Sequence, residues 1–143
     1  MMLYIASNIL LLVIPFNENN PAFHTEQLGE NDEMIKKHFS NDYVLYADSS
    51  EGCGCGFQHA LINNNTDWLY VVDEEEEGYR RNMQQLREYV ESVVEKGGKV
   101  ELYACWDGGF EDTPLSKEAI SSDELTSCDF YLKEKGFYTI NYR

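Results

Sequence analysis

The chain has 143 residues, of which 43% are hydrophobic and 13% aromatic, so its length and composition are those of one folded domain, residues 1–143, rather than of a disordered segment. Its 26 acidic residues outnumber its 11 Lys and Arg residues, and the formal net charge is −15 at pH 7. This charge argues against nucleic acids and anionic membranes as partners, because both bind cationic surfaces.

The N-terminal region holds two apolar runs, residues 3–6 and 9–16, and each predicts a buried strand. The second run is the most apolar stretch of the chain, but it is short, since a membrane-spanning helix needs about 20 apolar residues. Residues 1–8 contain no Lys or Arg, which the start of a signal peptide would carry. We therefore expect a cytoplasmic protein without a membrane segment.

The next part of the chain predicts a short helix and a strand. Apolar residues recur at roughly helical spacing in residues 31–39, and residues 43–47 are rich in β-forming side chains. The strand runs into residues 48–56, which contain too many glycines for the middle of a regular helix. Cys53 and Cys55 are therefore expected on a loop after a strand.

The clearest element is an amphipathic helix over residues 74–96, which follows a strand-like run at residues 68–72. Asp73 is its predicted N-cap, the glutamates of residues 74–77 lie where the helix dipole favours anions, and residues 97–98 are a glycine stop. This position gives the acidic run a structural explanation rather than a metal-binding one. The apolar face repeats every three or four residues: Tyr79, Met83, Leu86, Tyr89, Val90, Val93 and Val94.

Residues 99–107 alternate between apolar and polar side chains and predict a strand. With residues 68–72 and the helix, they form a candidate βαβ crossover, parallel and right-handed if both strands share a sheet. Residues 130–132 and 137–142 predict two strands joined by a tight turn, and residues 114–125 fit either a short helix or a loop with a brief strand. The predicted fold class is therefore α+β (mixed α/β), with one sheet of about five to six strands packed against one long amphipathic helix and one short helix.

The motif with the clearest chemical content is Gly-Cys-Gly-Cys-Gly-Phe at residues 52–57. Thiolate and imidazole are zinc ligands, so Cys53, Cys55, His59 and Cys105 are the candidate metal ligands, with zinc as the one cofactor considered. Cys128 is the alternative to Cys105 as the fourth ligand. Against this, the usual structural-zinc spacing is C-x₂-C, and the chain has no second pair of that kind.

Two other interpretations of this motif stay open. In the first, exposed thiols carry redox or nucleophilic chemistry, although Asp48 and Glu51 would raise a thiol pKa and no Lys or Arg is near. In the second, the glycines supply positive φ angles and let another backbone pass closely, the thiols are small buried hydrophobes, and Phe57 anchors the loop in the core. A chain of this size needs no disulfide framework, so the cysteines are expected to be reduced.

The three histidines, His24, His38 and His59, are scattered along the chain. Each one alone is more typical of a surface or capping residue than of a metal ligand.

The cysteine motif, with residues 4–7 upstream and residues 101–106 downstream, resembles a group of small uncharacterised bacterial proteins that carry a Gly-Cys-Gly-Cys-Gly-Phe loop. The resemblance implies a bacterial cytoplasmic protein and no particular activity.

Two functions follow as hypotheses. The first is a non-enzymatic, acidic protein-binding module that recognises a basic protein, regulatory or similar to bacterial immunity proteins in size and charge. The alternative is a metal- or thiol-dependent site built on Cys53, Cys55 and His59. An exposed apolar patch would favour the first hypothesis, and a concave site around the cysteines would favour the second.

Overall fold

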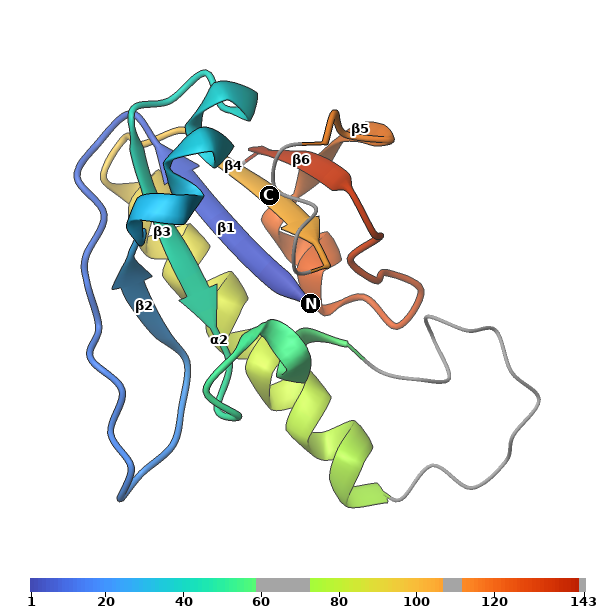
Figure 1. Ribbon diagram of the computed structural model, residues 1–143. Coiled ribbons are helices and arrows are strands. Elements are labelled where there is room, and N and C mark those ends of the chain that lie inside the picture. The colour runs from blue at the N-terminus through green and yellow to red at the C-terminus, as the bar shows by residue number, and fades with distance from the viewer. Residues whose placement is uncertain (59–72, 107–111, 142–143) are drawn as a thin grey trace.

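The computed structural model describes residues 1–58, 73–106 and 112–141 (Figure 1). Within these residues the chain forms an open, six-stranded mixed sheet in the order β2-β3-β1-β4-β6-β5, which confirms the predicted α+β class. The strands are β1 (Met2–Ser7), β2 (His24–Gln27), β3 (Tyr43–Asp48), β4 (Val100–Cys105), β5 (Ser116–Ser121) and β6 (Gly136–Asn141). The helices are the long α-helix α2 (Asp73–Glu95) and three 3₁₀ helices, η1 (Glu30–His38), η2 (Gly54–Phe57) and η3 (Ser122–Thr126).

The sheet is mostly antiparallel. Strand β1 pairs antiparallel with β3 on one side and with β4 on the other, so β3 and β4 run parallel to each other with β1 between them. Helix α2 lies between β3 and β4 in the chain, which makes a split βαβ unit. The predicted strand at residues 68–72, and with it the predicted crossover, lies outside the described residues.

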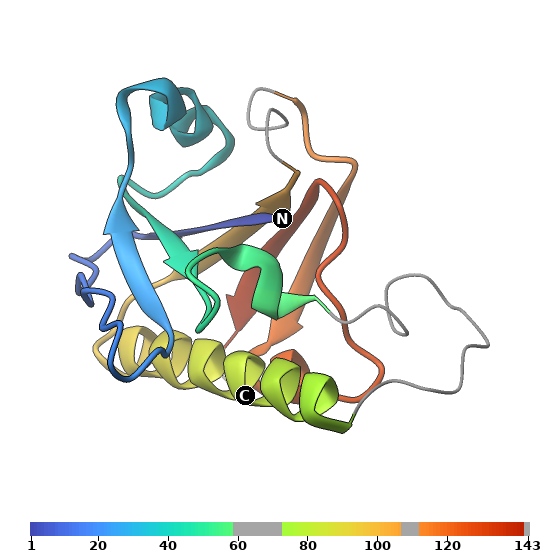
Figure 2. The same ribbon diagram turned by 60° about the horizontal axis from the view of Figure 1, so that its bottom comes forward.

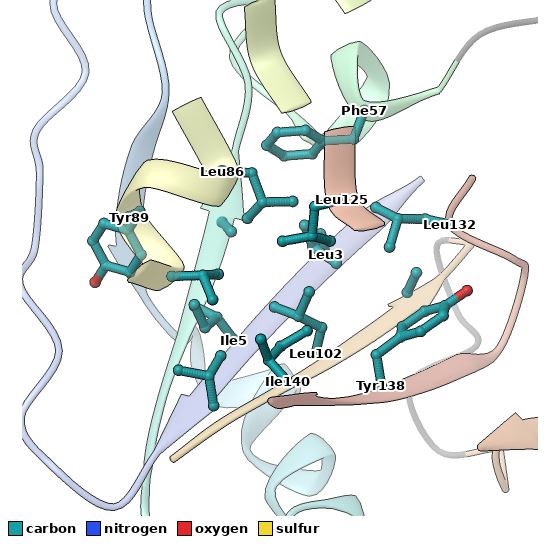
Figure 3. Close-up of a cluster of buried hydrophobic side chains, with 14 of the residues drawn as sticks. Leu3, Ile5, Phe57, Leu86, Tyr89, Leu102, Leu125, Leu132, Tyr138 and Ile140 are labelled. Carbon is teal, nitrogen blue, oxygen red and sulfur yellow. The ribbon is translucent and has the colours of Figure 1, made fainter. Parts of the chain in front are cut away.

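Helix α2 covers one face of the sheet, as Figure 2 shows. Its buried hydrophobic residues, from Tyr79 to Val93, belong to the predicted apolar face. They pack against side chains that alternate along the strands, such as Leu3 and Ile5 of β1 and Leu102 of β4 (Figure 3). The amphipathic helix expected from the sequence is therefore confirmed, and the main core lies between it and the sheet.

The opposite face of the sheet is covered by η1, which confirms the short helix expected near residues 31–39 (Figure 2). Its one buried residue, Ile35, packs into a second cluster. That cluster contains Tyr4, Ala6, Ile35, Val44, Tyr103, Cys105 and Phe137.

Two expected strands are absent from the described sheet. Residues 9–16 run beside the edge strand β2 without entering the sheet (Figure 1), and side-chain hydroxyls bind part of their backbone. Residues 130–132 cannot pair with β6, because β6 already has β4 on one edge and β5 on the other. The ambiguous residues 114–125 supply that second partner, β5, followed by η3.

Among the described helices, none is long and apolar enough to cross a membrane.

Candidate functional site

The loop that carries the two close cysteines is built around the buried Ser49, which follows the last residue of β3. The backbone N–H and the hydroxyl of Ser49 both donate to the carbonyl oxygen of Cys53, at 2.8 and 2.7 Å. The backbone N–H of Gly56 donates to the same hydroxyl at 3.0 Å. One buried serine therefore holds both ends of the cysteine motif.

Asn82 of α2 fixes the loop from the other side. Its amide oxygen accepts from the backbone N–H of Ser50 at 3.1 Å, and its amide nitrogen donates to the carbonyl oxygen of Gly56 at 3.3 Å. Asn82 itself is buried. The loop is thus attached to the helix by side-chain hydrogen bonds as well as by the end of β3.

The glycines of the motif have the structural role that the sequence suggested. Gly52 has φ +82°, which a residue with a side chain adopts at a cost. A Cβ atom on Gly54 would overlap the carbonyl oxygen of Met1. The absence of a side chain at Gly54 therefore allows the backbone at the start of β1 to pass close to the loop. Phe57 is 1% exposed and points into the core near Leu86 (Figure 3), which confirms it as the anchor of the loop.

The two thiols differ from expectation. Cys53 and Cys55 form a disulfide, Cys55 is exposed and Cys53 is half-buried. The expectation of reduced, buried thiols is therefore wrong for this pair, because the loop brings the two side chains together at its surface. The backbone N–H of Cys55 donates to Cys53 Sγ at 3.2 Å, so a hydrogen-bond donor already faces one of the two sulfurs.

The other candidate ligands are placed as follows. Glu51 is close to both sulfurs, and the ligand atoms of Glu51, Cys53 and Cys55 lie within 4.8 Å of one another. Cys105 is buried in β4 on the face that η1 covers and is not part of this group. His59 lies outside the described residues.

A second surface feature is apolar. Residues 9–16, called here the apolar segment, expose Leu10 to 77%, Leu12 to 65% and also Val13 and Phe16. Leu11 between them is buried. A groove of about 530 Å³ lies between this segment and the C-terminal half of α2, which contributes Tyr89, Ser92 and Val93; Lys96, directly after the helix, lines it as well.

A third feature, on β2 and β3, was not predicted from the sequence. His24 is 2% exposed, contrary to the expectation of a surface histidine, and it lies beside the buried Asp48. Burial raises the pKa of Asp48 to about 8, and the neighbouring Glu26 adds to this through a hydrogen bond and its charge. These three residues come together only through strand pairing, so no local motif could have revealed them.

No protein-family model, no curated protein and no solved structure matches this chain.

Proposed function

We propose that this protein is a binding module for a basic protein partner, which it contacts through the apolar segment. The observation that supports this proposal is the exposure of Leu10 and Leu12, at 77% and 65%, on a backbone that is held in place. Contiguous exposed apolar side chains of this size are typical of interaction surfaces.

The backbone of the segment is fixed by hydrogen bonds. The carbonyl oxygen of Leu12 accepts from the hydroxyls of Tyr89 at 2.7 Å and Thr25 at 2.8 Å. The backbone N–H of Ile14 donates to Thr25 Oγ1 at 2.8 Å, and the backbone N–H of Thr25 donates to the carbonyl oxygen of Ile14 at 3.0 Å. A fixed backbone loses little conformational entropy on binding, so the apolar side chains are preorganised for a partner.

The charge of the chain indicates the kind of partner. A net charge of −15 attracts a cationic protein over a distance comparable to the Debye length and repels acidic ones. The residues around the segment include both signs: Asp42 and Glu88 line its grooves together with Lys36 and Lys96. Charge therefore supports the encounter, and the apolar side chains supply the contact.

The test uses a partner isolated with the wild-type chain and then purified. The double variant Leu10→Ser with Leu12→Ser should weaken its affinity at least 100-fold, measured by calorimetry. Leu115→Ser is the matched control, because Leu115 is 75% exposed but belongs to another part of the surface. The affinity should also fall as salt is raised. An acidic partner, or equal losses in the double variant and the control, would contradict the proposal.

A second candidate function is thiol–disulfide exchange at Cys53 and Cys55, which the disulfide on an exposed loop favours. A partner thiolate attacks Cys55 Sγ, the exposed sulfur, and Cys53 leaves as a thiolate. The backbone N–H of Cys55, 3.2 Å from Cys53 Sγ, stabilises the leaving thiolate. A second partner thiol then resolves the mixed disulfide, so the partner is oxidised to a disulfide and the loop is reduced to two thiols.

This candidate is tested with dithiothreitol as the partner dithiol, by following the intact mass over time. The wild-type chain should gain two hydrogens, and Cys53→Ser should abolish the exchange. Cys128→Ser is the control, because Cys128 is an exposed free cysteine outside the loop. Once reduced, the two thiols together with Glu51 are also the group that would hold zinc. Zinc retained by the reduced wild type but not by a double serine variant of the loop would favour that metal site over exchange.

A further inference from the structure

The pairing of β2 with β3 brings three potential metal ligands to one place. His24 lies opposite Asp48 in the antiparallel register, and Glu26 is two residues along β2 and so on the same face. The ligand atoms of these three residues lie within 4.8 Å of one another. They belong to the face of the sheet that η1 covers, not to the cysteine loop.

The imidazole ring of His24 has two nitrogens, Nδ1 and Nε2, and the contact made by Nδ1 indicates which of them carries the proton. Nδ1 lies 3.1 Å from the carbonyl oxygen of Ala22, which can only accept a hydrogen bond. In the neutral imidazole, Nδ1 therefore carries the proton and Nε2 presents its lone pair. Histidines that bind metals are commonly oriented in this way, with the second nitrogen donating to a carbonyl oxygen.

The lone pair of His24 Nε2 faces another acceptor. Asp48 Oδ2 lies 3.4 Å from Nε2, is buried, and has no hydrogen-bond partner within the part of the chain that the structure describes. The side chains of His24 and Asp48 are 3% and 10% exposed, so bulk water does not compensate for the missing partner. When the Asp48 carboxyl is ionised, a buried acceptor without a donor is costly, and a cation between the two atoms would satisfy both.

The spacing fits a small transition-metal ion. Zinc bonds to nitrogen and oxygen ligands are about 2.0–2.1 Å long, so two ligands at a tetrahedral angle are about 3.3–3.4 Å apart. The separation of Nε2 and Oδ2, 3.4 Å, agrees with that value. We propose that His24, Glu26 and Asp48 form a binding site for a divalent transition-metal ion of the zinc type, a site independent of both proposed functions.

The surroundings define how the ion would reach the site. The ring of Phe16 packs at 4.7 Å from the His24 imidazole, while Glu26 is exposed. The ion would therefore enter past the Glu26 carboxylate, which supplies the third ligand, and water would complete the tetrahedron. Two carboxylates balance the charge of a divalent ion. The imidazole favours zinc over magnesium and calcium, which prefer ligand sets made only of oxygen.

The test is calorimetric titration of zinc into metal-free protein carrying Cys53→Ser and Cys55→Ser, so that the cysteine loop cannot bind the ion. We expect one zinc per chain, with magnesium and calcium binding at least 100-fold more weakly. His24→Gln and Asp48→Asn, each added to the same protein, should weaken zinc binding at least 100-fold. Glu77→Gln, an exposed carboxylate of α2, should leave it unchanged.

Thermal unfolding and circular dichroism of the metal-free variants separate loss of a ligand from loss of the fold. Zinc should raise the Tm of the parent and of Glu77→Gln but not that of the folded Asp48→Asn variant. A folded parent that takes up no zinc at millimolar concentration would overturn the proposal. Zinc binding that survives both His24→Gln and Asp48→Asn would overturn it as well.

Discussion

The two faces of the sheet are covered in different ways. On one face the 23-residue helix α2 lies over a core of aliphatic and aromatic side chains, including Leu3, Leu86 and Leu102. On the other face the nine-residue helix η1 contributes one buried side chain, Ile35, and the sheet itself presents polar groups. The buried polar and sulfur-containing residues of this second face are Tyr4, His24, Asp48, Glu101, Tyr103 and Cys105.

The polar groups of the second face bind parts of the chain that are far apart in sequence. The Glu101 carboxylate accepts from the backbone N–H groups of Ser40 and Asn41, each at 3.1 Å, and so fixes the turn after η1. The Tyr103 hydroxyl donates to the carbonyl oxygen of Asp112 at 3.1 Å, and burial raises the pKa of Tyr103 to about 12, so this donor keeps its proton at neutral pH. We infer that the α2 face supplies most of the stability, whereas the η1 face positions polar groups.

The largest expected effect is on the α2 face. Leu86 and Ile35 are both 0% exposed, one under each helix. Leu86→Ala should lower the free energy of unfolding by about 4 kcal/mol, and Ile35→Ala by about 2 kcal/mol, because a short 3₁₀ helix can close over the cavity more easily than a long α-helix. Urea unfolding of both variants measures the difference. Equal losses would contradict the view that the two faces contribute unequally.

The next effect concerns the buried carboxylate of the η1 face. Glu101→Gln removes a charge that accepts hydrogen bonds from Ser40 and Asn41, including one from the Asn41 side-chain amide. We expect a loss of about 2–3 kcal/mol, since hydrogen bonds to charged groups are the strong ones. Glu77→Gln is the control, because Glu77 is exposed on α2 and its loss should change the free energy of unfolding by less than about 0.5 kcal/mol. A loss no larger than that of the control would mean that Glu101 has no role in holding the turn.

The parts of the fold that depend on a local pattern could be predicted from the sequence, and the parts that depend on distant residues could not. Helix α2 was predictable, because one element buries one periodic face and the period is visible locally. Residues 9–16 were wrongly predicted as a strand, because an apolar run does not reveal that Thr25 and Tyr89 side chains will bind its backbone. Residues 130–132 were also wrongly predicted as a strand, because β6, the strand they were expected to pair with, is paired on both edges with other strands.

Some features of the candidate sites could also be predicted from local sequence signals, and others could not. The close approach at Gly54 and the anchor at Phe57 followed from the glycine spacing and from one aromatic residue, which are local signals. The disulfide depends on the loop conformation, which the sequence did not define. The pairing of His24 with Asp48 depends on the register between β2 and β3, and register is a property of the whole sheet.

A smaller effect is expected from the titration of Asp48, which should make the free energy of unfolding depend on pH when it is measured in the presence of a chelator. Its pKa in the folded chain, about 8, is above its usual value of about 3.9, so between these pH values the folded state binds more protons than the unfolded state. Stability should therefore fall as pH rises toward 8 and level off above it. Between pH 7 and pH 9 the fall should be on the order of 1–2 kcal/mol.

Asp48→Asn removes this titration and should unfold with a free energy that changes less over the same pH range. His24 and Glu26, which face Asp48, remain in that variant as an internal reference. A fall of the same size in the variant and the wild type would assign the pH dependence to other groups.

The smallest expected effect on stability is at Leu10 of the apolar segment, which lies beside the edge strand β2, and its neighbour Leu11 provides the comparison. Leu11 is 4% exposed and Leu10 is 77% exposed, although the two residues are adjacent and chemically identical. Leu11→Ala should lower the free energy of unfolding by about 2 kcal/mol because it opens a cavity, whereas Leu10→Ala should change it by less than about 0.5 kcal/mol. Chemical unfolding of the pair shows whether the segment keeps this arrangement in solution. If Leu10→Ala costs as much as Leu11→Ala, then Leu10 is part of the core, and the exposed apolar surface proposed to bind a partner does not exist.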